Sequence, residues 1–232
     1  VSQLMKNVYL NRDNHPNVAS QEVNTQLNLA NIPNKMLQKK IFRDIKDGVI
    51  DKNDTSFSIP AYRASSVTQE TGQVFLYEEG LPVFDNGQWR ELIASYTPSI
   101  NLYRPNVTIA GANFASPVCK SPKFYYKLYL VDSVVVDGKK QYQVLFKPKS
   151  TNGLYLQGTL MIDSATYAIE GADIETSPYT NVNILNKFSY KLEKGKTTQA
   201  LSLGYNPFKV EGMDVFGFML FTDKNDLSFT DS

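Results

Sequence analysis

The fold is decided by FYYKLYLVDSVVVDGKKQYQVLFK, residues 124–147. Two apolar runs, Phe124–Val136 and Lys140–Lys147, flank Asp137-Gly138. An Asp-Gly pair supplies the positive φ angles that a tight primed turn requires, so the stretch predicts a β-hairpin. In the second run Tyr142, Val144 and Phe146 share one face, and the polar residues Gln141, Gln143 and Lys147 lie on the other. Because successive strand residues point to opposite faces, this hairpin has one wet and one dry face.

Further strands follow this hairpin at short intervals. They are predicted over Leu154–Ile162, Tyr167–Glu175, Ile184–Glu193, Thr198–Tyr205, Val215–Phe221 and Leu227–Phe229. Asn152-Gly153 and Lys194-Gly195 supply turn residues between them, with Pro148 favouring a longer, bulged connection before Leu154. Consecutive strands joined by short turns predict an antiparallel meander over residues 124–232.

The first fifty residues are predicted to form a helix, a strand and a second helix. Apolar residues at helical spacing predict a helix over residues 1–10, and the alternation in Val23–Leu29 predicts a strand. Apolar residues recur every four positions from Leu37 to Val49, with lysines and an arginine on the other faces. We interpret this amphipathic helix as a cover for the sheet; the alternative is a surface for an anionic partner or membrane.

Residues 51–123 are predicted to be rich in loops. Short strands are expected at Ser56–Tyr62, Ser65–Glu70 and Gln73–Glu78, whereas Asn86-Gly87 reads as a turn. Leu102–Ile109 is expected to pair with a sheet edge, because Pro105 lacks the backbone donor that a central strand needs.

These patterns predict one domain over residues 1–232, of mainly β (α+β) class. A single curved antiparallel sheet covered by one or two helices accounts for them. The apolar fraction of 42% is sufficient for a substantial core. Aromatic usage, with 14 tyrosines and 13 phenylalanines beside 1 tryptophan, is typical of sheets.

Composition argues against several classes of function. The net charge of +1 offers no broad attraction for nucleic acid. A single cysteine, Cys119, and a single histidine, His15, exclude an intrachain disulfide and a zinc site built from several such residues. We interpret His15 as an exposed loop residue and Cys119 as an inert, partly buried thiol. The sequence predicts no catalytic residue, metal or cofactor, and therefore no enzyme.

A carboxylate pair, Glu78 with Glu79 or Glu91, is the one generic acid-base option, and adjacent glutamates occur by chance. The apolar face of the sheet is the better candidate site, for a lipid-like ligand on its concave side. The candidate ligand-binding residues are Tyr126, Leu128, Tyr142, Val144, Phe146, Leu156, Leu160 and Ile162. The alternative is that covering helices fill this face and make it a core.

Four segments carry a resemblance to a known family: Asn113–Pro117, Phe124–Asp132, Asp137–Lys149 and Leu160–Ile169. The chain resembles Bacteroidetes envelope proteins of unknown function, labelled carboxypeptidase-regulatory-like-domain proteins. The strand pattern is also similar to the LolA-like lipoprotein-carrier fold, a half-barrel sheet closed over by helices. The carboxypeptidase label refers to a non-catalytic accessory domain outside this chain, so no catalytic residue is carried over.

The resemblance implies a middle segment of a longer protein at the periplasmic face of the outer membrane. In the family, a β-sandwich precedes this region and a covalently linked outer-membrane barrel follows it. We therefore expect a non-enzymatic binding or interaction module, holding a lipid or another hydrophobic ligand. A purely structural spacer between the two flanking domains is the first alternative, and a carboxylate-pair hydrolase is the second.

Overall fold

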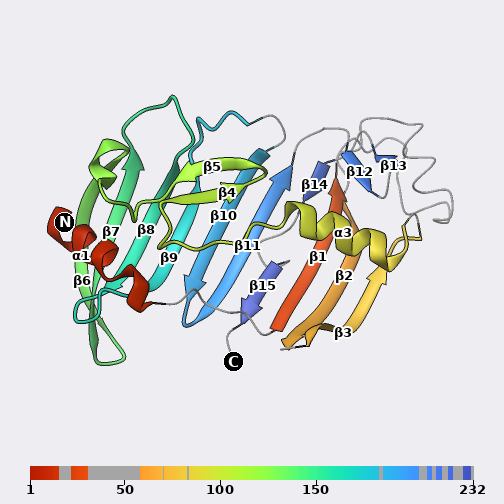
Figure 1. Ribbon diagram of the computed structural model, residues 1–232, viewed down its shortest axis with the longest axis horizontal. Coiled ribbons are helices and arrows are strands. Elements are labelled where there is room, and N and C mark those ends of the chain that lie inside the picture. Colours follow the sequence, from red (N-terminus) through yellow and green to blue (C-terminus); the bar gives the residue numbers. More distant parts are fainter. Residues whose placement is uncertain are drawn as a thin grey trace.

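The computed structural model describes residues 1–15, 22–30, 58–69, 71–82, 84–182, 185–203, 208–210, 213–215, 219–221 and 227–230. An 11-stranded antiparallel sheet dominates these residues (Figure 1). Its strands are β1 (Glu22–Ala30), β2 (Ser58–Gln69), β3 (Gly72–Gly80), β6 (Tyr126–Val136), β7 (Lys139–Pro148), β8 (Leu156–Asp163), β9 (Ile169–Thr176), β10 (Leu185–Glu193), β11 (Lys196–Leu203), β14 (Met219–Phe221) and β15 (Leu227–Thr230).

Two runs of neighbouring strands make up this sheet. β6 to β11 lie side by side in chain order, as do β1 to β3 at the other end. The two runs are joined by β14 and β15, each of which pairs with both β1 and β11. The sheet is not a closed barrel, because β6 and β3 lie at opposite ends of the strand order. The predicted meander is therefore confirmed from β6 to β11, whereas β14 and β15 lie between β11 and β1, and the chain's N-terminal strands extend the sheet.

The turns of the meander have the predicted chemistry. Asp137 and Gly138, between β6 and β7, have φ angles of 50° and 77°. Lys194 and Gly195, between β10 and β11, have φ angles of 50° and 74°. Successive positive φ angles match the right-handed twist of the flanking strands, which is why such turns close hairpins.

Helices and a small ribbon cover one face of the sheet. They are α1 (Ser2–Leu10), the 3-10 turn η1 (Arg12–Asn14), α3 (Asn86–Tyr96), the ribbon of β4 (Asn106–Ile109) with β5 (Ala112–Ala115), and the 3-10 turn η2 (Pro122–Phe124). Figure 1 shows α1, the β4–β5 ribbon and α3 on the same side of the sheet. A second ribbon pairs β12 (Phe208–Val210) with β13 (Met213–Val215). None of the described helices is long and apolar enough to cross a membrane.

The predicted fold class, a mainly β sheet covered by helices, is confirmed. The predicted helix over residues 1–10 is α1, whereas the amphipathic helix from Leu37 to Val49 lies outside the described residues. The predicted strand at Val23–Leu29 is β1, and the two short strands expected between Ser56 and Glu70 form one strand, β2.

Two details of the loop-rich region were wrong. Asn86-Gly87 begins helix α3 and is not a turn, because Asp85 and Gln88 form a capping box in which each side chain accepts the other's backbone N–H. The strand expected at the sheet edge, Leu102–Ile109, is shortened to β4, which pairs with β5 in a separate ribbon. Pro105 immediately precedes β4, so the residue without a donor stays outside the ladder.

Candidate functional site

The inner face of the sheet carries all eight residues predicted as a ligand site. Tyr126, Val144, Phe146, Leu156, Leu160 and Ile162 are at most 1% exposed. Leu128 and Tyr142 are partly buried. Across the strands, Val144 lies opposite both Leu130 and Leu160, which places the predicted residues on one continuous face.

The buried cover contributes apolar side chains to the same core. Met5 and Val8 of α1, together with Val107, Ile109 and Phe114 of the β4–β5 ribbon, belong to one cluster with the inner-face residues. Tyr126 joins the two layers with its ring and its hydroxyl. The ring meets Phe146 edge to face with centroids 5.3 Å apart, and the hydroxyl donates to the Ala115 carbonyl and accepts the Leu156 N–H at 3.1 Å. A ligand on this face therefore requires that the cover move.

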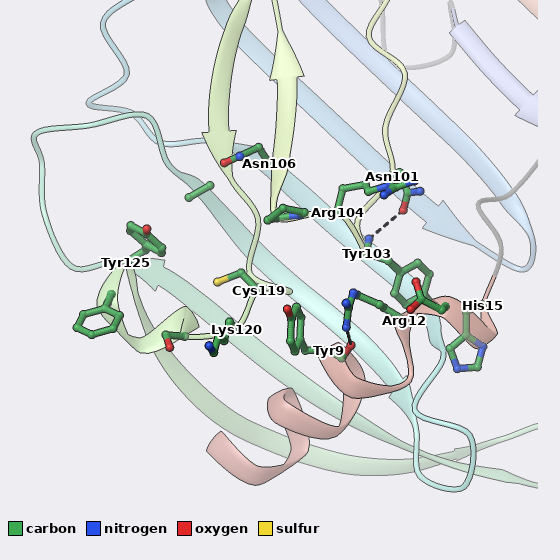
Figure 2. A pocket seen from close by; sticks show the side chains of 15 residues that line it. Tyr9, Arg12, His15, Asn101, Tyr103, Arg104, Asn106, Cys119, Lys120 and Tyr125 are labelled. Carbon is green, nitrogen blue, oxygen red and sulfur yellow. Dashed lines mark hydrogen bonds between the residues drawn. The ribbon is translucent and has the colours of Figure 1, made fainter.

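An open cavity of about 780 Å³ lies beside the cover, between the N-terminal helical segment and the loop on either side of β4 and β5. Its lining residues are Tyr9, Arg12, Asp13, His15, Asn101, Tyr103, Arg104, Pro105, Asn106, Ala115, Cys119, Lys120, Ser121, Phe124 and Tyr125. Figure 2 shows Tyr9, Arg12 and Arg104 in the middle of the view, with Lys120 and Tyr125 toward one side. The volume suits a small organic ligand or a short peptide segment.

The cavity carries an excess of positive charge. Arg12, Arg104 and Lys120 line it, against the single carboxylate of Asp13. Within the described part of the chain, none of these three cations forms an ion pair. Arg12 is held in place by its own segment: its Nη1 donates to the Tyr9 carbonyl at 2.8 Å, and its guanidinium lies 4.1 Å from the Tyr9 ring centroid. Among the described residues, the Tyr9 carbonyl is the one hydrogen-bond acceptor of the Arg12 guanidinium, which has five N–H donors.

The other wall of the cavity is tied to the sheet by His15 and Tyr103. His15 Nε2 lies 2.9 Å from the Thr166 carbonyl, and its ring stacks on Tyr103 at 5.7 Å. The Tyr103 hydroxyl accepts the Ile169 N–H at 2.8 Å, and burial raises the pKa of that phenol. His15 is thus a loop residue, as predicted, but it is half-buried and within hydrogen-bonding distance of the turn between β8 and β9, and not exposed as its sequence context predicts.

Cys119 lines the cavity but is only 8% exposed. Burial raises the pKa of its thiol, and the Ser121 backbone hydrogen bond opposes that shift. A raised pKa keeps sulfur in the thiol form, which is the weaker nucleophile. The geometry supports the prediction of an inert thiol.

The carboxylates singled out in the sequence, Glu78, Glu79 and Glu91, do not line this cavity. Glu78 accepts from Arg90 Nε at 2.6 Å and from the Tyr62 hydroxyl at 2.5 Å, and the Arg90 hydrogen bond lowers its pKa. A general acid needs a raised pKa, so Glu78 is unsuited to that role. Among the described residues, no group of three or more His, Cys, Asp or Glu side chains could hold a metal ion.

The cavity was not predicted, because its walls come from distant parts of the sequence. Tyr9 and Arg12 precede Arg104 and Lys120 by about ninety residues or more, so no local spacing marks the site. The one sequence feature that could have indicated the cavity was the pair of lysines, Lys120 and Lys123, that follows Cys119.

Comparisons with known proteins place the chain in a family. Two solved structures are similar over most of their length: that described as MucB in complex with MucA(peri), at 7% identity and a TM-score of 0.27, and MucB, at 9% identity and 0.26. They cover 98% and 97% of this chain, and 92% of each matched chain. No curated protein matches.

One family model, described as "Family of unknown function (DUF5686)", matches residues 19–202. Since that match spans more than half of the sequence, the chain belongs to this family of unknown function.

Proposed function

We propose that the chain is a non-enzymatic binding module, and that the cavity takes a ligand combining an anionic group with an apolar or aromatic part. The observation that carries the proposal is the set of three cations, Arg12, Arg104 and Lys120, lining a concave site without an ion pair in the described structure. Tyr9, Tyr125 and Phe124 supply ring surface beside them. Arginine pairs with carboxylate or phosphate through a planar fork of donors, which gives both affinity and orientation.

Anilinonaphthalene sulfonate tests this proposal, because it combines a fused ring system with one negative charge. Binding is followed by fluorescence titration at low and high salt. The double variant Arg104→Ala/Lys120→Ala should bind the probe at least about tenfold more weakly than the parent protein, since a hydrogen bond to a charged group contributes about 1.5–3 kcal/mol to the binding free energy. Both side chains are exposed, so their truncation leaves the core intact.

Arg63→Ala is the matched control, because Arg63 is exposed on β2 and does not line the cavity. Circular dichroism checks that each variant keeps its sheet. Equal affinity in the double variant and in the control would rule out an anion site in the cavity.

A hydrophobic ligand on the inner face is a second proposal, which rests on the continuous apolar surface from Tyr126 to Ile162. It requires that α1 and the β4–β5 ribbon separate from the sheet. Lipid extraction of the purified chain, followed by mass spectrometry, tests it directly. If nothing is bound and added fatty acid leaves the melting temperature unchanged, the purely structural spacer is the better account of this face.

The location at the periplasmic face of the outer membrane rests on the resemblance to Bacteroidetes envelope proteins. Under this proposal the chain stands between an accessory β-sandwich and a covalently linked barrel. Fractionation of cells that produce the full-length protein, with protease added before and after outer-membrane permeabilisation, tests it. Cleavage within this region before permeabilisation would contradict a periplasmic position.

A further inference from the structure

β6 forms one edge of the sheet, and its outer side has no strand partner among the residues that the structure describes. The strand spans 11 residues and pairs with β7 along its length. Strands in globular proteins are usually about 5–6 residues long, and a long open edge presents a row of unpaired N–H and C=O groups. β6 is thus a ready template for a further strand.

The edge strand also exposes apolar side chains. Tyr129, Leu130 and Val131 are about half exposed, at 47%, 50% and 55%. Val135 is 73% exposed, and Phe124, just before the strand, is 80% exposed. Soluble proteins blunt such edges with charged residues and bulges, and β6 has Lys127 and one bulge, but its exposed apolar side chains indicate a contact surface.

A bulge divides β6 into two halves. The register with β7 shifts between Leu130 and Asp132, and the Asp132 carboxylate accepts the Ser133 N–H at 2.7 Å. A strand that binds along the outer side cannot keep a regular ladder across this point. The uninterrupted half is Tyr126–Leu130, which is long enough for a short ladder.

The surroundings of this half are basic. Residues 120–149 contain seven lysines and two aspartates, a net of five positive charges in a chain whose total is +1. All seven lysines are exposed, and five of them, Lys120, Lys123, Lys127, Lys147 and Lys149, are not paired with the second half of β6, whereas Lys139 and Lys140 lie opposite Val136 and Val135 in that second half. Both aspartates, Asp132 and Asp137, belong to the second half of β6 and its turn. The first half therefore faces a partner with positive charge alone.

The positive charge favours one kind of binding partner for the β6 edge over the others. A second copy pairing through the same half of β6 would bring like charges together, which is unfavourable. A membrane would attract the lysines, but an open strand edge in hydrocarbon leaves backbone groups unpaired at a cost of several kcal/mol each. An acidic strand satisfies both the charges and the backbone.

We propose that Tyr126–Leu130 of β6 binds an extended, glutamate- or aspartate-rich segment of a partner protein, which adds a strand to the edge of the sheet. Main-chain hydrogen bonds supply affinity, as in other complexes formed by strand addition, while the lysines select acidic partners. The partner's apolar residues contact Tyr129 and Leu130.

A short synthetic peptide in which glutamate alternates with valine and threonine tests this proposal on the full chain. Binding is measured by isothermal titration calorimetry at low salt and mapped by amide shifts in nuclear magnetic resonance spectra. The same peptide with alternate backbone nitrogens methylated keeps its charge but loses one edge of donors. We expect it to bind at least about tenfold more weakly, because several hydrogen bonds are lost.

Two double variants separate the halves of the strand. Lys123→Gln/Lys127→Gln should lower the affinity for the acidic peptide several-fold. Lys139→Gln/Lys140→Gln, the matched control, should lower that affinity less. Equal binding of the methylated peptide would overturn the proposal, as would no binding of the parent peptide at low salt. Co-sedimentation with anionic vesicles that the Lys123→Gln/Lys127→Gln variant abolishes, without peptide binding, would identify the edge as a lipid-surface site instead.

Discussion

The two edge strands of the sheet differ in how they are protected. β3 is braced by α3: Arg90 binds Glu78 and lies 3.9 Å from the Phe75 ring centroid, while Trp89 donates to the Leu81 carbonyl at 3.0 Å. β6 is contacted by the short turn η2 instead of a helix, and its exposed apolar side chains lie in a lysine-rich hairpin, whereas those of β3, namely Val74, Leu76 and Tyr77, lie beside Glu78 and Glu79. In Figure 1 the two strands lie at opposite ends of the sheet. The outer side of β3, like that of β6, has no strand partner among the described residues, so the two edges differ in the side chains that surround them and not in their backbone pairing.

The core beneath the β6 end provides the largest predicted effect. Phe146→Asp should unfold the protein or destabilise it by more than about 4 kcal/mol, because Phe146 is fully buried and no cation is there to pair with a carboxylate. Leu76→Asp is the control: Leu76 lies on the β3 edge and is 67% exposed, so the change should stay within about 0.5 kcal/mol. Urea unfolding followed by circular dichroism measures both. A stable Phe146→Asp variant would show that the inner face is not core.

The packing of α3 against β3 should give the next largest effect on the free energy of unfolding. Trp89 is 1% exposed and packs against Tyr62 and Phe84, so Trp89→Ala should cost about 3–5 kcal/mol. Gly80 approaches Trp89 so closely that an added Cβ would lie 2.5 Å from the indole, which makes the packing specific. Glu91→Ala, an exposed change on the same helix, is the control. A loss below about 1 kcal/mol for Trp89→Ala would mean that α3 does not brace β3.

The ion pair between Arg90 of α3 and Glu78 of β3 predicts that stability depends on pH. Arg90 and Tyr62 stabilise the charged form of Glu78, so its pKa in the folded state lies below the ordinary 4.5. Its contribution is therefore present above the unfolded-state pKa and is lost as pH falls through the folded-state pKa. Glu78→Gln should cost about 1–2 kcal/mol near neutral pH, and this difference should shrink in acid. Unfolding curves from neutral to acid pH measure it; a difference that grows in acid would contradict the assignment.

The basic end of β6 should give the smallest effect on stability. Lys123→Gln/Lys127→Gln should change the free energy of unfolding by less than about 0.5 kcal/mol, because both side chains are exposed and form no ion pair in the described structure. Thermal unfolding in low salt checks this. A large loss would mean that these lysines hold the fold, so that their effect on peptide binding could not be assigned to contact.

Much of the fold was predictable, because it depends on local patterns. Asp137-Gly138 and Lys194-Gly195 mark turns through backbone angles that few other residues adopt, and the alternation in residues 141–147 fixes a dry face. Helix α3 was missed because Asn86-Gly87 is also a turn signal. The capping box of Asp85 and Gln88 was the better indicator, and it was legible in the sequence.

The candidate site was far less predictable. The predicted ligand residues are on one face, as expected, but whether α1 and β4–β5 would fill that face depended on contacts between Met5 or Phe114 and strands far away in the chain. The cavity likewise depends on Arg12 and Arg104 lining the same space from distant parts of the chain. Neither residue is remarkable in its own segment.

The sequence by itself determined which segments become strands, where their turns lie and which side of each strand is apolar, because these follow from backbone angles and from a period of two. Only the tertiary structure decided that β14 and β15 join the meander to β1, that a ribbon covers the inner face, and that α3 packs against one edge strand while the other edge strand lies in a lysine-rich hairpin. Such pairings are set by the packing of distant segments, and no single segment encodes the partner that it will meet.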